Sequence, residues 1–411
     1  MSLINTNQNY LSTMGIPEED PQVGVIVSVY YLGTAIGAVI FSYIADQYGR
    51  KPSLFACLAT ASLGNLIMFV SGLGYSQGAL AVMYLGRVVM GLGVGGVDAV
   101  VPVYSSELSD EGGRGKALAQ EFQSNIFGLN MAFAINLGVT QSLGKSNEWA
   151  WRIPIIVMQF YPLSLLLLYS RLPESPRWFM FHDRKDDAKD SLIFIEGEEE
   201  GEKMYEQLQE ATQNESGESI GYMDMFNPRH SMFHPTMVTV MGQVNQALTG
   251  YGGKSHLSHL LSFSLPKPHM VPLPRHTMQQ HADHTILHLA VSVYGPQIFE
   301  LLGYSVQTSE FLTQGNYISY FLLMTFAWLL VDAVGRRTVL LGGSGALTIC
   351  FFLLALFGGL ASNAGQLGIP VQAVAVPGIV SLFVATGAFG VGWLATIWVS
   401  PTNMELVLFW S

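Results

Sequence analysis

Long apolar runs constrain the fold of this chain more than any other feature of its sequence. A helix that spans a membrane needs about 20 mostly apolar residues, because it crosses about 30 Å of hydrocarbon at about 1.5 Å per residue. Nine segments meet or approach this requirement, at 23–44, 54–70, 79–103, 122–143, 153–169, 237–252, 312–334, 339–360 and 371–399. The segment 237–252 is short. The sequence therefore predicts an all-α membrane protein with about nine spans.

The composition agrees with a membrane protein and excludes several other classes. Half of the residues (50%) are hydrophobic and 12% are charged. The net charge of -11 comes largely from an acidic stretch at 196–210, so the chain has no basic surface for nucleic acid. We find no pair of nucleophile and base, no metal-ligand cluster and no cofactor loop, and we expect neither an enzyme nor a bound cofactor or metal. Residues 1–14 are polar and lack the features of a signal peptide.

The distribution of Lys and Arg predicts the orientation of the spans, because these residues accumulate in cytoplasmic loops. Alternate loops contain Arg50 and Lys51, Arg114 and Lys116, the long segment 171–229, and Arg336 and Arg337. The opposite loops contain only Lys145 and Arg152. This asymmetry places residues 1–21 outside and the segment 171–235 inside. An odd number of spans that starts outside predicts that a first helix is absent from this chain.

Small residues are dense along the predicted spans. The clearest case is the set Gly91, Gly93, Gly95 and Gly96. Within lipid, helices associate through close backbone approach, so we expect these glycines to mark packed helix faces.

Two predicted inner loops have similar sequences, which indicates an internal repeat. Asp46-Gln-Tyr-Gly-Arg-Lys51 and Asp332-Ala-Val-Gly-Arg-Arg337 each follow one long apolar segment and precede another. Many secondary transporters are built from repeated halves with the substrate site between them. We therefore predict an N-terminal transmembrane half at 1–169, a cytoplasmic helical linker at 170–235 and a C-terminal half at 236–411.

Four ordered motifs lead to a known family. They are Gly86-Arg87, Pro102-Val-Tyr-Ser-Ser-Glu107, Arg114-Gly115 and Pro173-Glu-Ser-Pro-Arg-Trp178. Together with the repeated loops, they resemble the sugar porters of the major facilitator superfamily, over about 23–402. The resemblance implies two pseudo-symmetric six-helix halves, of which the first, eleventh and twelfth helices are missing here. It also implies a monomer in the plasma membrane that transports a sugar or related polyol together with protons, by alternating access.

The charged residues of these motifs fall at the predicted cytoplasmic ends of helices. They are Asp46, Arg50, Glu107, Arg114, Glu174 and Arg177, with Asp332, Arg336 and Arg337 in the second copy. Bonds between carboxylate and guanidinium groups are strong at such sites and re-form readily with solvent. The resemblance implies a conformational latch that joins the halves when the site faces outward. The alternative is a set of static anchors at the membrane interface.

The resemblance implies five substrate-binding residues, and the sequence departs from the family pattern at several of them. The five are Gln123, Gln246, Tyr294, Tyr320 and Trp398. Gln123 lies one residue beyond the family's glutamine, and Ala247 and Gly252 replace two amides near Gln246. Tyr320 stands where an Asn is usual. Fewer amides predict a different or more weakly bound substrate, and Trp398 could instead be a core or interfacial residue.

Two ionisable residues inside the spans are candidates for proton coupling. In proton-coupled sugar porters, the residue that matches Arg87 pairs with an Asp of the first helix, which is absent here. Asp98 lies on the same predicted helix at nearly the same angle, but about 16 Å away along the axis, which is too far for a direct pair. We predict that Asp98 is a secondary protonation site, with a structural hydrogen bond as the alternative.

The segment 253–289 interrupts the family pattern. It contains seven of the ten histidines and four prolines but no sustained apolar run. Deleting it restores one helix of the family pattern, so we predict a translated intron: Gly-Lys-Ser at 253–255 fits a splice donor, and Leu289 fits an acceptor. The His residues lack a metal-ligand spacing, and Leu248 breaks the pattern of a phosphate-binding loop.

Three functions remain open at this stage. The first is secondary transport of a sugar or polyol. The second is a transporter-like sugar sensor, which would keep the latch motifs but signal through long tails. The third is a non-functional truncated product, because the family pattern ends after Thr402.

Overall fold

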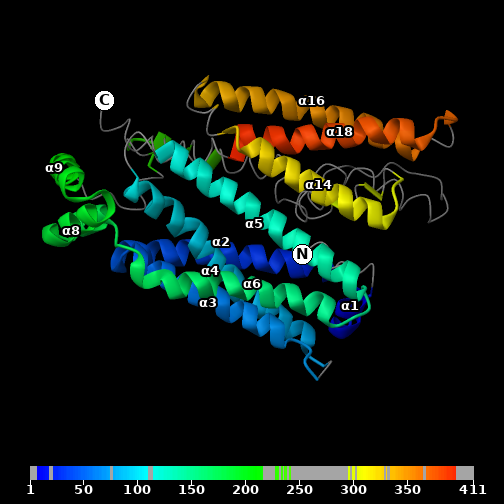
Figure 1. The fold of residues 1–411 in the computed structure, drawn as a ribbon, viewed down its shortest axis with the longest axis horizontal. Coiled ribbons are helices and arrows are strands. Elements are labelled where there is room, and N and C mark those ends of the chain that lie inside the picture. Colours follow the sequence, from blue (N-terminus) through cyan, green and yellow to red (C-terminus); the bar gives the residue numbers. More distant parts are fainter. Residues whose placement is uncertain are drawn as a thin grey trace. The chain divides into compact units, whose positions relative to one another are not determined.

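The fold was determined as a computed structural model (Figure 1). It describes residues 7–17, 22–74, 77–109, 114–215, 227–230, 233–234, 236–237, 240–241, 295–296, 299–300, 303–327, 330, 334–363 and 367–394. All regular structure in these residues is helical, which confirms the predicted all-α class. The short span 237–252 and the segment 253–289 lie largely or wholly outside the described residues.

The described helices follow one another in a simple order. The first group is α1 (Gln8–Met14), α2 (Gln22–Tyr48), α3 (Arg50–Val70), α4 (Ala79–Leu108), α5 (Arg114–Leu143) and α6 (Trp149–Leu168). A short 3-10 turn, η2 (Tyr169–Arg171), leads to α7 (Pro176–Phe181), α8 (Lys185–Glu196) and α9 (Glu198–Glu215). The last group is α14 (Val306–Met324), α16 (Arg336–Ser362), α18 (Val371–Phe389) and the π-helical turn η6 (Gly390–Leu394).

Seven helical segments of the described part are long and apolar enough to cross a membrane. They correspond to α2, α3, α4, α5, α6 with η2, α16, and α18 with the start of η6. The predicted span 312–334 starts too late, because α14 begins at Val306. Helix α14 ends at Met324, and the described residues 327, 330 and 334 are again helical. The polar Ser305 caps this helix by accepting a hydrogen bond from the Thr308 N–H at 3.3 Å, so the helix starts before the apolar run. Within the predicted span 371–399, α18 ends at Phe389 and η6 continues to Leu394, and residues 395–399 lie outside the described residues.

The chain divides into two compact units, and each is described by itself. One unit contains residues 3–117 and 138–227, and the other contains 118–137 and 228–411 with the first two residues. In the first unit, α4 packs between α2 and α3, and its glycines allow the contact. A methyl group at Gly91 or Gly95 would collide with the backbone of α2, and one at Gly93 with the backbone of α3. At Gly96 it would meet side chains from both neighbours. The predicted packing role of these glycines is confirmed.

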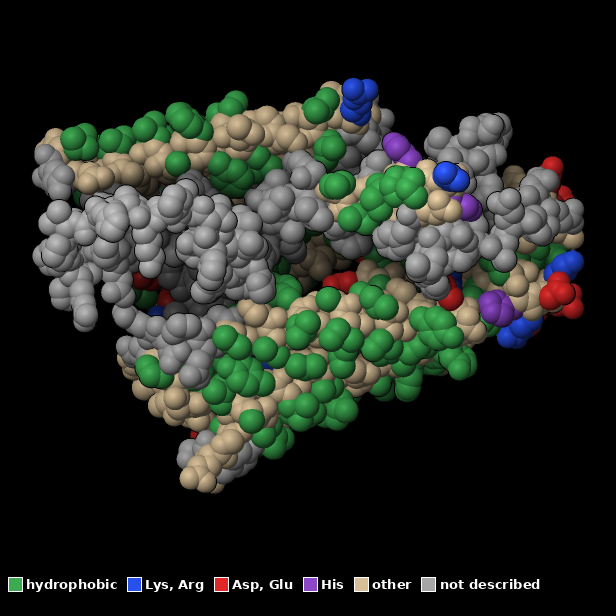
Figure 2. Space-filling view, turned by 180° about the vertical axis from the view of Figure 1, so that it is seen from behind, with side chains coloured by type: hydrophobic (Ala, Val, Ile, Leu, Met, Phe, Trp, Pro, Cys, Tyr) green, Lys and Arg blue, Asp and Glu red, His purple; other side chains and the backbone are tan. Residues whose placement is uncertain are grey.

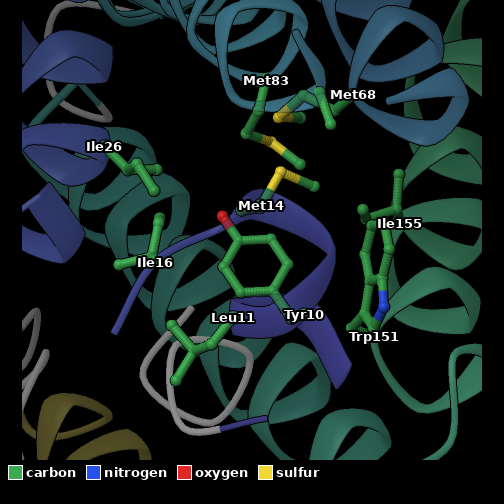
Figure 3. Packing of buried hydrophobic residues seen from close by; sticks show 10 residues of the cluster. Tyr10, Leu11, Met14, Ile16, Ile26, Met68, Met83, Trp151 and Ile155 are labelled. Carbon is green, nitrogen blue, oxygen red and sulfur yellow. The ribbon is translucent and has the colours of Figure 1, made fainter. Parts of the chain in front are cut away.

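Helix α1 was not predicted from the sequence, yet it completes the core of the first unit. Asn7 begins it by accepting a hydrogen bond from the Tyr10 N–H at 2.9 Å, and Gly15 ends it with a φ of 70°. Figure 3 shows the Tyr10 ring beside Trp151, with the sulfur atoms of Met14, Met68 and Met83 gathered near it. The Trp151 indole N–H also donates to the Asn9 side chain at 3.1 Å. Short polar segments of this kind give no periodic signal, because their helix forms only through tertiary contacts.

In the second unit, α16 and α18 run side by side (Figure 1). Close approach of α16 to the end of α18 and to η6 depends on glycine, because a methyl group at Gly343 would lie 2.7 Å from the Cα of Gly392 in η6 and 3.3 Å from the Ala388 carbonyl oxygen in α18. Outward-facing side chains of both units are largely apolar, such as Val39, Leu167 and Phe352. In Figure 2, apolar side chains cover the helices, whereas charged side chains gather at the end that carries α8 and α9. This division fits a multi-pass membrane protein whose helices face lipid.

Helices α7 to α9 form a small layer of their own. Phe179 and Met180 of α7 pack with Ala188 of α8, and Tyr205 and Leu208 of α9 cover them. The acidic side chains of α9 lie on the opposite, exposed face, as expected for an amphipathic helix in water. This layer begins in the segment predicted to be the cytoplasmic linker.

Candidate functional site

A charged cluster joins one end of α2, α3 and α4. Arg50 donates two hydrogen bonds to the carboxylate of Glu107, from Nε at 3.0 Å and from Nη2 at 2.9 Å. Its Nη1 donates to Asp46 at 3.0 Å and to the Ala45 carbonyl at 2.8 Å. The Arg50 and Glu107 side chains are only 13% and 9% exposed, whereas Asp46 is 54% exposed. The bidentate pair is therefore the strong part of the cluster, and Asp46 is an outer partner.

Glu174 reaches the same cluster from far along the chain and caps α3. Its carboxylate accepts hydrogen bonds from the backbone N–H groups of Arg50 at 2.9 Å, Lys51 at 3.1 Å and Ser175 at 2.8 Å. A carboxylate at a helix N-terminus satisfies free N–H groups and faces the positive end of the helix dipole. Burial raises the pKa of Glu174 above its ordinary value, and these hydrogen bonds oppose that shift. The position of Glu174 is therefore fixed by three hydrogen bonds to its carboxylate, which a shorter or apolar side chain could not form.

Gly49 explains the glycine of the repeated motif. Its φ of 105° favours glycine, and a methyl group there would collide with the Glu174 carboxylate. Gly335 of the second copy precedes α16 with a φ of 87° and ψ of 145°, close to the values of 105° and 162° at Gly49. The two glycines thus share a backbone conformation, as the two motifs share a sequence pattern. This agreement is consistent with the predicted internal repeat.

Three further contacts attach η2, the segment that follows it and α7 to the cluster. The Tyr104 hydroxyl donates to the Pro173 carbonyl at 2.6 Å, and the Trp178 indole N–H donates to the Asp46 carbonyl at 3.0 Å. The ammonium of Lys51 lies over the Tyr169 ring, 5.0 Å from its centre. The motif 173–178 is therefore a structural connector between α6, α2 and α4.

The structure brings four of the predicted latch residues together, namely Asp46, Arg50, Glu107 and Glu174. The guanidinium of Arg177 lies 5.8 Å from the Phe181 ring centre. Of the rest, Arg337 is exposed, and Asp332 and the side chains of Arg114 and Arg336 lie outside the described residues. All four clustered residues belong to one unit. A latch between the two halves stays a prediction.

The second unit contains a chain of amide contacts between α5 and α14. The Gln123 side-chain amide donates to the Thr325 hydroxyl at 2.7 Å. Two turns further along α5, Asn130 donates to the Tyr317 carbonyl at 2.8 Å and accepts from the Gln314 amide at 3.3 Å. The seven-residue spacing of Gln123 and Asn130 places both on one helix face, which is a signal that the sequence offered. The role of Gln123 in binding substrate stays a prediction.

The other predicted substrate residues are only partly visible. Tyr320 is 3% exposed, and its ring packs closely against Gly390 within an apolar cluster that includes Met324 and Phe389. Gln246, Tyr294 and Trp398 lie outside the described residues.

The two candidate proton-coupling residues have different surroundings. Arg87 is 4% exposed and interacts electrostatically with Tyr10, Tyr30 and Tyr31. Tyr10 comes from the unpredicted helix α1, so sequence reasoning could not identify it as a neighbour. Asp98 has an exposed side chain on α4. Among the described residues, no group of three or more His, Cys, Asp or Glu side chains is arranged to hold a metal ion.

Comparisons with known proteins agree with this architecture. The family model described as "Sugar (and other) transporter" matches residues 2–255 and 278–406. An MFS-type transporter of Aspergillus oryzae is 25% identical, with 95% of this chain and 64% of the relative covered. A high glucose sensor of Saccharomyces cerevisiae is 28% identical, with 98% and 47% covered. A probable quinate permease of Neosartorya fischeri is 29% identical, with 92% and 64% covered. The chain thus spans about half to two thirds of the length of these relatives.

Solved structures identify the fold. A proton:xylose symporter, XylE, bound to 6-bromo-6-deoxy-D-glucose matches with a TM-score of 0.70 and 19% identity, over 97% of this chain and 76% of that chain. A partially occluded, inward-open form of the xylose transporter XylE from E. coli matches with a TM-score of 0.69 and 18% identity, over 100% and 86%. The chain therefore has the major facilitator fold.

Proposed function

Because the chain belongs to the sugar transporter family, we propose that it carries out secondary transport of a sugar or related polyol across a membrane by alternating access. The observation that supports this most is the cluster of Arg50, Glu107 and Glu174. It fixes the ends of α2, α3 and α4 into one rigid group. A transporter of this fold moves its halves as rigid bodies, so it needs helix ends that are locked within each half.

The exposed side of the cluster supplies the part that could change during transport. Asp46 is half exposed and bonded to Arg50 at only one nitrogen, so water or another charged group can replace it at small cost. We propose that this outer layer, together with Arg114, Arg177, Asp332, Arg336 and Arg337, forms the latch between halves. Static anchoring at the membrane interface is the alternative.

Coupling to protons belongs to the same proposal. Arg87 is a buried cation surrounded by phenol groups, and Asp98 is a second ionisable residue on α4. Ionisable residues within spans are costly and commonly serve a transport function. Uptake measured against pH in an Asp98→Asn variant tests this assignment, and an unchanged pH dependence removes Asp98 from the mechanism.

Substrate contacts are proposed at Gln123, Gln246, Tyr294, Tyr320 and Trp398. Amide groups can donate to and accept from sugar hydroxyls, and aromatic faces can cover the C–H surface of a sugar ring. We also propose a monomer in the plasma membrane.

A sugar sensor is the second candidate function, because one relative is a high glucose sensor. Uptake of a panel of labelled sugars and polyols by transporter-deficient cells that express the full-length protein separates the two. We expect uptake of at least one compound above the vector control. Sugar-dependent signalling without uptake would favour the sensor. The absence of both uptake and signalling would contradict both functions.

The segment 253–289 is proposed to be a translated intron. The family model leaves out residues 256–277, which lie inside this segment. Sequencing the transcript tests the proposal. A dominant message that retains these codons would refute it.

A further inference from the structure

Helix α6 carries an exposed apolar stripe that ends on an arginine. Phe160, Leu163 and Leu167 are exposed and are separated by three and four residues, so they lie on one face of the helix. Leu167 has the largest exposed fraction of the three, 82%. Arg171 follows four residues later in η2 and is also exposed. In a membrane, this stripe lies against acyl chains and Arg171 reaches the level of the headgroups.

Helix α3 carries a second stripe, which ends on a lysine. Phe55, Leu63 and Leu66 are exposed and fall within about 80° of the helix circumference. Lys51 lies one turn before Phe55 on the same side of the helix. Because α3 packs on α6, the two apolar stripes belong to neighbouring helices.

The two stripes meet at Tyr169, the first residue of η2. The Tyr169 ring lies 5.1 Å from the Phe55 ring, measured between centres, and 5.0 Å from the Lys51 ammonium. The start of α3 and the end of α6 therefore bring Lys51 and Arg171 to the same end of both stripes. Aromatic rings between an apolar stripe and a cation are typical of the membrane interface.

The two cations have no carboxylate partner. Among the described residues, neither the Lys51 ammonium nor the Arg171 guanidinium forms an ion pair or a hydrogen bond. The carboxylates of the neighbouring cluster are engaged elsewhere. Glu174 accepts from backbone N–H groups at the start of α3, and Asp46 pairs with Arg50. Both cations are therefore available to an anion from outside the protein, and phosphate oxygens form strong, charge-assisted hydrogen bonds with such groups.

We propose that Lys51 and Arg171 bind the headgroup of an anionic phospholipid whose acyl chains lie along the exposed stripes of α3 and α6. A phospholipid fits better than a soluble anion, because the cations stand at the end of two apolar surfaces rather than in a polar pocket. The site lies on the predicted cytoplasmic side, where anionic lipids collect. This interaction goes beyond the proposed transport function and does not depend on which compound is transported.

The test measures lipid retained by the purified full-length protein in detergent, with labelled dioleoyl phosphatidylserine over a range of concentrations. Dioleoyl phosphatidylcholine, which has no net charge, is the comparison lipid. We expect the wild type to bind phosphatidylserine more tightly than phosphatidylcholine. Lys51→Gln and Arg171→Gln should each weaken the affinity for phosphatidylserine about fivefold, the contribution of one cation near an anionic lipid.

Two control variants separate this site from a general effect of charge. Lys185→Gln removes the same charge from an exposed position at the start of α8, away from both stripes, and should leave the affinity for phosphatidylserine unchanged. Lys51→Arg keeps the charge and should retain binding. If Lys51→Gln does not fold, Arg171→Gln alone decides, because Arg171 is exposed and contributes no contact to the core.

Three results would overturn the proposal. The first is an equal affinity of the wild type for phosphatidylserine and phosphatidylcholine. The second is an unchanged affinity for phosphatidylserine in Arg171→Gln, or a loss in Lys185→Gln as large as that in Arg171→Gln. The third is displacement of phosphatidylserine by inorganic phosphate but not by chloride at the same ionic strength, which would assign the cations to a soluble anion instead of a lipid.

Discussion

Replacing Gly49 with Ala should destabilise the first unit by more than its backbone conformation alone explains. At Gly49, the positive φ costs an Ala side chain about 1–3 kcal/mol. The added methyl group would also displace the Glu174 carboxylate from the N-terminus of α3. Loss of a helix cap costs about 1 kcal/mol more. The expected total is therefore about 2–4 kcal/mol.

Gly335 provides the matched control, because the second copy of the motif has nearly the same backbone but open space around the added methyl group. Gly335→Ala should show the strain cost alone. The two variants are compared by unfolding of the purified protein in detergent. The cost of Gly49→Ala should also fall to that of Gly335→Ala when Glu174 is first replaced by Ala. Equal destabilisation by both glycine variants in the wild-type background would refute the capping role of Glu174.

Three further perturbations test the cluster and the helix packing. Arg50→Lys loses the bidentate bond to Glu107 and should lower the free energy of unfolding by about 1–3 kcal/mol. Asp46→Asn should lower it by under about 1 kcal/mol. Equal losses would contradict the assignment of Glu107 as the strong partner and Asp46 as the outer partner. Gly95→Ala should lower the free energy of unfolding by about 1–3 kcal/mol, because the backbone of α2 lies against Gly95. Gly138→Ala is the control, because an added methyl group there meets no atom within 4 Å. Thermal unfolding in detergent compares the two variants, and an unchanged stability of Gly95→Ala would contradict the packing of α4 on α2. Burial raises the pKa of Glu174 in the folded protein above its ordinary value of 4.5. The stability that Glu174 contributes is therefore fully present below pH 4.5 and is lost as the pH rises through the pKa of the folded protein. Wild type should therefore lose stability relative to Glu174→Gln over this window, and a pH-independent difference would contradict the shift.

Much of the fold could be predicted from the sequence, because lipid demands long apolar helices and the motif loops have strict backbone requirements. The glycines at Gly49 and Gly335 illustrate this: their repeated sequence corresponds to a repeated conformation. Helix limits were less accurate, since helices continue into polar residues beyond the apolar run. This is why α14 starts at Val306, where Ser305 caps it.

The candidate site was harder to predict, because its contacts join residues that are distant in sequence. The motif indicated that Glu174 is charged and important, but not that it caps α3. Likewise, no local pattern places Tyr10 near Arg87, since that contact depends on α1 folding against the core.

Counterflow in liposomes tests the central claim most directly. Vesicles that contain the full-length protein are loaded with an excess of an unlabelled sugar found to be taken up by cells and then diluted into the same labelled sugar. Alternating access predicts transient accumulation of label above its external concentration, because the loaded sugar returns each emptied site to the outside. Label that only equilibrates, at the rate of protein-free vesicles, would contradict transport by this protein.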